Sequence, residues 1–187
     1  MDAIPLLVSN DRLAVACALA FGSYAGGNLS FIHPISTEMA SAISRLFRPA
    51  VLQPGPIDYE PRAIAYGQNT FLMAIGENSG VTPVWKGHGH TREFALQLPS
   101  MSEAFSSSFI DDRLTVPTNA HYLSSARYPD DQALLPYIAQ AVLLSEDFDV
   151  GTISLPSGTV RNDTIRSVGA LLASCGLKIR IPTAAQV

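Results

Sequence analysis

The most constraining feature of the chain is its final third, where a strand pattern, a helix pattern and a second strand pattern follow one another. Residues 149–156 (DVGTISLP) and 177–182 (LKIRIP) have the short apolar runs of strands. Between them, residues 157–176 are apolar at helical spacing, and Gly176 stands where a helix ends in a left-handed cap. Two strands joined by a helix lie parallel in one sheet with a right-handed crossover. The side chains predicted to point inward from this helix are Ile165, Val168, Leu172 and Cys175.

The N-terminal part of the chain suggests a second unit of the same kind. Residues 4–8 are predicted as a short strand, residues 13–21 as a helix that is apolar all round and therefore buried, and residues 28–35 as a strand. Ser36 is placed to cap the next helix, with Glu38 in its first turn. The apolar stripe of that helix consists of Met39, Ile43, Leu46 and Phe47.

The middle of the chain has a different pattern. The proline-rich residues 48–62 predict an extended connector, the best candidate for a boundary inside a single domain of residues 1–187. Residues 63–76 are predicted as a hairpin turning at Gln68-Asn69, and residues 81–98 as a hairpin turning at 87–90. Residues 99–131 predict irregular structure with room for one short helix, and a regular helix should begin at Pro136.

These elements together predict a mixed α/β (α+β) fold. Two strand–helix–strand units at the chain ends surround an antiparallel hairpin block, and helices cover one sheet. The order of the strands in that sheet cannot be predicted from the pattern.

Composition limits the classes of function. Only 15% of the 187 residues are charged, the net charge is −4, and the chain has just two lysines. A surface with so few charged side chains resembles a protein–protein interface. The arginines are scattered and form no basic run, which argues against nucleic acid as a partner. The longest apolar run, residues 13–21, is too short to cross a bilayer. Cys17 and Cys175 both fall in apolar segments, so we expect buried thiols, a reducing compartment and a cytoplasmic location.

The stretch WKGHGHTR, residues 85–92, contains two of the four histidines. His88 and His90 would lie on the same side of a strand and could supply two metal ligands, but no further ligand motif frames them. The neighbouring glycines favour a hairpin turn instead, with exposed histidines and no bound metal. Trp85, His88, His90 and Arg92 are then candidate contacts for a partner.

A second candidate site is the segment that follows the strand at 149–156. Ser157, Gly158 and Thr159 precede the predicted helix and Arg161 lies one turn further on. Amide groups at a helix start, two hydroxyls and a glycine that allows close approach can hold a phosphate or carboxylate. The alternative is that Ser157 or Thr159 is only an N-cap, because the segment lacks the signatures of nucleotide-binding loops.

Other chemistry has less support in the sequence. No nucleophile motif selects a catalytic serine, the cysteines look buried, and Asp111-Asp112 and Glu146, Asp147 and Asp149 have the pattern of solvated loops. We therefore expect no catalytic residue, no cofactor and no metal. The leading hypothesis is a non-catalytic protein-interaction or assembly protein, either a subunit or an inhibitor, of the type that phages and mobile elements carry. Its partner would be another protein or a second copy of the chain. Two alternatives stay open: a small α/β enzyme or ligand-binding domain using residues 157–161, and a metal-dependent hydrolase using His88 and His90.

Overall fold

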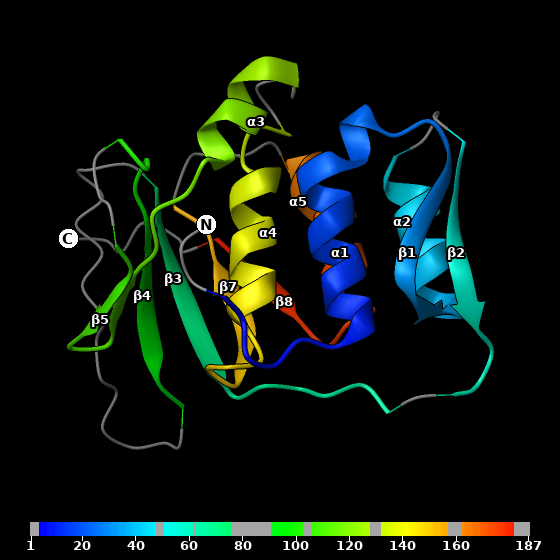
Figure 1. The fold of residues 1–187 in the computed structure, drawn as a ribbon. Coiled ribbons are helices and arrows are strands. Elements are labelled where there is room, and N and C mark those ends of the chain that lie inside the picture. The colour runs from blue at the N-terminus through cyan, green and yellow to red at the C-terminus, as the bar shows by residue number, and fades with distance from the viewer. Residues whose placement is uncertain are drawn as a thin grey trace.

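The computed structural model describes residues 4–47, 51–61, 63–75, 91–102, 106–127, 132–156 and 162–181 (Figure 1). The elements in chain order are α1 (Asn10–Phe21), the short 3₁₀ turn η1 (Gly22–Tyr24), β1 (Gly27–Ser36), α2 (Thr37–Leu46), β2 (Leu52–Asp58), β3 (Asn69–Ile75), β4 (Glu93–Leu98), β5 (Ser108–Ile110), β6 (Arg113–Thr115), α3 (Ala120–Arg127), α4 (Leu135–Leu144), β7 (Val150–Ser154), α5 (Asn162–Ala173) and β8 (Lys178–Arg180).

The main sheet has the strand order β5-β6-β4-β3-β7-β8. All neighbouring strands in it run parallel except β5 and β6, which form an antiparallel pair. A second, two-stranded sheet pairs β1 with β2 in parallel. Helices and mixed sheets together confirm the predicted mixed α/β class.

The C-terminal unit matches its prediction closely. β7 and β8 are parallel neighbours joined by α5. Gly176 has a φ of 78°, and the Leu177 N–H donates to the Leu172 carbonyl at 3.0 Å while the Gly176 N–H donates to Ala173 at 3.2 Å. This pair of bonds is the Schellman motif that ends a helix at a left-handed glycine. Val168, Leu172 and Cys175 are buried as predicted, whereas Ile165 is half-buried.

The N-terminal unit is built from different residues than predicted. Residues 4–9 form no strand, and α1 starts where Ser9 accepts a hydrogen bond from the Arg12 N–H. The strand–helix–strand unit is instead β1–α2–β2, with Ser36 capping α2 as expected. The predicted connector at 48–62 therefore contains a strand. Its prolines are tolerated because β2 pairs on one side only, so a missing N–H on the other side breaks no ladder bond.

The predicted hairpin at residues 63–76 is also corrected. Residues 63–68 form no strand, and β3 pairs in parallel with β4 on one side and β7 on the other. The run FLMAI in β3 is apolar without alternation, and such a run is typical of a parallel strand buried on both faces. The one hairpin among the described strands is β5–β6, which turns at Asp111 and Asp112 with φ values of 51° and 58°. Two left-handed residues in a two-residue loop are typical of a type I′ turn.

α4 and α5 pack on one face of the main sheet. Ile138 of α4, Val168 of α5 and Ile179 of β8 line one small cavity, so α4 and α5 cover the same face. α1 packs against α4, and α2 packs against α5 (Figure 1). A single cluster of buried side chains runs through both sheets and all four of these helices. No described helix is long and apolar enough to cross a membrane.

Candidate functional site

Most of the residues singled out in the sequence lie outside the described part of the chain. These are Trp85, His88 and His90, and Ser157, Gly158, Thr159 and Arg161. Arg92 is described and exposed just before β4. Its backbone ties β4 to β3, because its N–H donates to Asn69 Oδ1 at 2.8 Å and its carbonyl accepts from the Thr70 N–H at 2.9 Å.

Described elements lie on either side of residues 157–161, the segment of the predicted anion site. β7 ends at Ser154, at the carboxyl edge of the main sheet, and α5 begins at Asn162. The chain passes from β3 to β4 on one side and later returns to β7 on the other side of β3. Such a reversal of strand order is where open α/β sheets bind ligands. Ser154 is buried, and its hydroxyl has no hydrogen-bond partner among the described residues.

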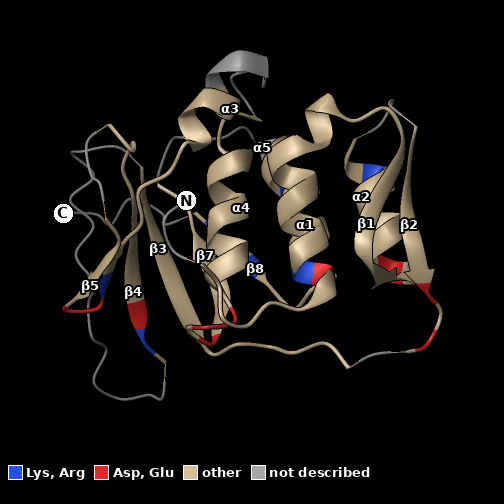
Figure 2. Ribbon diagram, viewed as in Figure 1, with Lys and Arg blue, Asp and Glu red and all other residues tan. Residues whose placement is uncertain are grey.

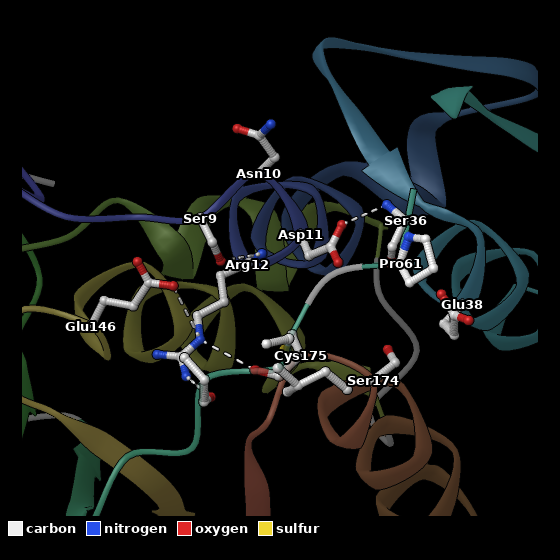
Figure 3. Close-up of a pocket in the computed structure, with 13 residues that line it drawn as sticks. Ser9, Asn10, Asp11, Arg12, Ser36, Glu38, Pro61, Glu146, Ser174 and Cys175 are labelled. Carbon is white, nitrogen blue, oxygen red and sulfur yellow. Dashed lines mark hydrogen bonds and ion pairs between the residues drawn. The ribbon is translucent and has the colours of Figure 1, made fainter. Parts of the chain in front are cut away.

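A cavity of about 270 Å³ lies at the opposite, amino edge of the same sheet. Its walls come from the starts of α1 and α2, from Pro61 and residues 63–65 before β3, and from the end of α5 (Figure 3). That volume is near the lower limit of roughly 300 Å³ for pockets that hold drug-sized ligands. Its polar lining residues are Ser9, Asn10, Asp11, Arg12, Ser36, Glu38, Glu146 and Ser174.

Arg12 is the central side chain of this cavity wall, and only 3% of it is exposed. Its Nη1 donates to Ser145 Oγ at 2.9 Å, and its Nη2 donates to the Ala65 carbonyl at 3.1 Å. Its Nε donates to the Cys175 carbonyl at 3.3 Å and lies 3.5 Å from Glu146 Oε1 (Figure 3). One guanidinium thus joins α1 to three other parts of the chain.

The surroundings of Arg12 explain why a charge is stable there. Ser145 caps the C-terminus of α4, and Cys175 follows the end of α5, so the guanidinium faces the negative ends of two helix dipoles. Glu146 supplies the counter-charge that a buried cation needs. We conclude that Arg12 holds the protein together at this junction, with its donors engaged by the protein itself. The available signal was a lone arginine at the start of the otherwise apolar run RLAVACALAF.

The acidic side of the cavity has a similar structural role. Asp11 Oδ1 accepts the Ser36 N–H at 2.8 Å, which joins the start of α1 to the start of α2. Ser36 Oγ in turn accepts the Met39 N–H at 3.2 Å. These bonds satisfy amide groups that helix starts leave without partners. The cavity is therefore shaped in part by helix capping.

Neither cysteine is set up as a nucleophile. Cys175 is 6% exposed, and burial raises the pKa of its thiol to about 12. Burial also raises the pKa of Cys17, which is half-buried rather than fully buried as expected. Both thiols are free of a disulfide and remain protonated near neutral pH.

The carboxylates that the sequence placed in solvated loops have defined structural roles. Asp111 and Asp112 form the β5–β6 turn, and Glu146 pairs with Arg12. Asp147 accepts two amides, from Leu6 at 3.0 Å and from Leu7 at 2.7 Å. The described residues contain no group of three or more side chains arranged to hold a metal ion.

The hydrogen bonds from the Leu6 and Leu7 amides to Asp147 hold an exposed apolar segment in place. The sequence pattern does not predict this exposure. Ile4, Leu6 and Leu7 are 84%, 87% and 63% exposed, although the backbone of the last two is fixed by Asp147. The next residue, Phe148, has its ring 5.5 Å from the ring of Phe109, which is 52% exposed. We call this group the N-terminal apolar surface; it consists of Ile4, Leu6, Leu7 and Phe109.

Comparison of the chain with protein-family models, with curated proteins and with solved structures finds no match.

Proposed function

We propose that the chain is a non-catalytic protein-binding subunit that docks through the N-terminal apolar surface. The observation that supports this is the arrangement of Leu6 and Leu7, whose amides are held by the Asp147 carboxylate while their side chains face solvent. Large apolar side chains that are exposed close together on a protein are typical of an interaction site. A cytoplasmic location, and a place in a phage or mobile-element complex, belong to the same proposal.

The energetics favour docking at this place. Fully burying one exposed aliphatic side chain contributes about 1.5–3 kcal/mol, and the surface has three of them besides Phe109. Because Asp147 already fixes the backbone of Leu6 and Leu7, less conformational entropy is lost when a partner binds. The aromatic cluster of Phe71, Phe94 and Phe148 supports Phe109 from below and keeps its ring in place.

The test is an affinity capture with tagged wild-type chain and a Leu6→Asp/Leu7→Asp variant in the cells that make the protein. Proteins that depend on this surface should be captured by the wild type and lost with the variant, and binding should be repeated with the purified partner. Ile32→Asp is the matched control, because Ile32 is 90% exposed on β1 and lies outside the surface. A set of captured proteins that is unchanged by Leu6→Asp/Leu7→Asp would refute the proposal.

A ligand-binding role for residues 157–161 is the second candidate function. The buried Ser154 hydroxyl without a described partner, at the carboxyl end of β7 beside the reversal of strand order, favours it. Phosphate or a nucleotide should then raise the melting temperature, and Gly158→Val should abolish the shift. The absence of any shift at millimolar concentrations would remove this candidate.

The remaining alternative, a metal-dependent hydrolase, depends on His88 and His90. Elemental analysis of protein purified without chelator tests it directly. We expect no stoichiometric zinc; one equivalent that is lost in the His88→Ala/His90→Ala variant would support the hydrolase instead.

A further inference from the structure

We infer that the partner segment bound by the N-terminal apolar surface is apolar at its centre and carries lysine or arginine at its rim. This inference rests on the proposed function. It comes from the carboxylates that lie next to Phe109 and Phe148 in the chain. Asp111 and Asp112 follow Phe109 by two and three residues, and Asp147 and Asp149 stand on either side of Phe148. Figure 2 shows acidic residues at the β5–β6 turn and in the loop between α4 and β7.

These carboxylates lack a counter-charge among the described residues. None of Asp111, Asp112, Asp147 and Asp149 forms an ion pair with a described side chain. Arg113 follows the turn directly, but it registers with Ala95 whereas Leu114 registers with Leu96, so it points to the opposite face of the sheet. Within the described part of the chain no cation balances this rim, and a partner with basic side chains would balance it.

The same charges argue against two other occupants. An isologous dimer places the same patch of two copies face to face, so the four carboxylates of one copy would oppose those of the other. A membrane surface with anionic lipids attracts basic rather than acidic rims. A basic, apolar protein segment has neither conflict, because its side chains can fill the surface and neutralise the rim together.

Charge complementarity of this kind has a measurable signature. Charges at the rim mainly raise the association rate, and salt screens them. Binding should therefore weaken as salt is added, through slower association, while the contribution of Leu6 and Leu7 to affinity should remain. The two parts of the surface can be separated by experiment for this reason.

The probes are two fluorescein-labelled synthetic peptides with the same leucine- and phenylalanine-containing centre, one flanked by lysines and the other by glutamates. Fluorescence anisotropy would measure their binding to the full chain at low and high salt. We expect the lysine peptide to bind at least about tenfold more tightly than the glutamate peptide at low salt, and the ratio to shrink at high salt.

Variants assign the effect to residues. Asp111→Asn/Asp149→Asn removes two charges, and asparagine tolerates the left-handed backbone at both positions, so the turns should stay intact. This variant should weaken the preference for lysine, because two of the four rim charges are gone, whereas Leu6→Asp/Leu7→Asp should lose binding of both peptides. Ile32→Asp should behave as the wild type.

The outcomes separate the inference from the proposed function. Equal binding of both peptides to the wild type, abolished by Leu6→Asp/Leu7→Asp, would overturn the basic partner and leave the docking surface standing. Binding that is unaffected by Leu6→Asp/Leu7→Asp would overturn both. If neither peptide binds the wild type, the inferred partner chemistry is wrong, and the affinity capture alone decides the proposed function.

Discussion

Arg12 shows how one residue can determine the arrangement of several elements. Within α1 it follows the cap residue by three positions, and its side chain reaches the ends of α4 and α5 and the backbone before β3. From the sequence it was one scattered arginine among ten. Its role could not be predicted because each of its acceptors is far away in the chain, and two of them are backbone carbonyls that carry no residue-specific signal.

Arg12→Ala is predicted to lower the free energy of unfolding by roughly 3–5 kcal/mol, the usual cost of breaking a buried ion pair by removing one partner. Arg12→Lys should recover only part of the loss, because an ammonium group cannot reach three separate acceptors in a plane. Urea titrations followed by circular dichroism measure both. A wild-type midpoint for Arg12→Lys would show that charge alone matters.

The buried thiol of Cys175 predicts a pH dependence of stability. The pKa of this thiol rises from 9.0 to about 12 in the folded protein, so the folded state binds more protons than the unfolded state in that window. The stabilisation is complete below pH 9 and is lost as the pH rises towards 12, by at most about 1.4 kcal/mol per pH unit. Urea midpoints of the wild type and Cys175→Ala should therefore converge, or cross, with rising pH. A constant difference between them would contradict the shift.

At the scale of elements, predictability depended on whether the signal was local. α2 and α5 carry their own caps, stripes and stop signals, and both were predicted with their main features. Strand pairing is not local: β3 was assigned to a hairpin because a short polar pair precedes it, although its unbroken apolar run favoured a parallel strand between two neighbours. Likewise, the prolines of β2 predict a connector, because the sequence does not show that β2 pairs on one side only.

Gly176 gives the sharpest prediction for an element. Its φ is positive, and a Cβ at this position would overlap the carbonyl oxygen of Ala65. Gly176→Ala should therefore cost about 2–4 kcal/mol, from left-handed strain together with displacement of the chain before β3. Gly26→Ala is the control, because nothing lies within 4 Å of its Cβ position. Equal unfolding midpoints in urea for the two variants would contradict the left-handed conformation of Gly176 at the end of α5.

The β5–β6 turn predicts a different response. Asp112 has a φ of 58°, which aspartate tolerates and a β-branched residue does not. Asp112→Val should destabilise the protein by about 1–2 kcal/mol, whereas Asp112→Gly should be neutral or slightly stabilising in a type I′ turn. Thermal unfolding of both variants is the measurement, and a loss with glycine equal to that with valine would point to a role for the carboxylate instead of the backbone.

For the whole molecule, the mixed α/β class followed from the alternation of patterns, whereas the division into two sheets and the exposed surface did not. The N-terminal apolar surface arises because the amides of Leu6 and Leu7 are held by Asp147, about 140 positions away in the chain. The sequence pattern of residues 4–8 predicts a strand instead. A pattern of apolar residues predicts burial; only the tertiary contact shows that these side chains stay outside. The strongest candidate for function is thus the feature that contradicts its own local pattern.

The two sheets should nevertheless unfold as one domain. Ile35, Met39 and Ile43 from the β1–α2–β2 unit belong to the same buried cluster as Phe71 and Ile153 of the main sheet. Met39 is completely buried, so Met39→Ala should destabilise the molecule by roughly 2–5 kcal/mol. If the core is one cooperative unit, the loss must appear equally in the exchange protection of amides in β3 and β7, far from the substitution. Ile32→Ala, in the same unit but exposed, should change neither. Faster exchange confined to α2, β1 and β2 would show that the 48–62 region separates two independent units, because only a boundary there could isolate the main sheet from a cavity at residue 39.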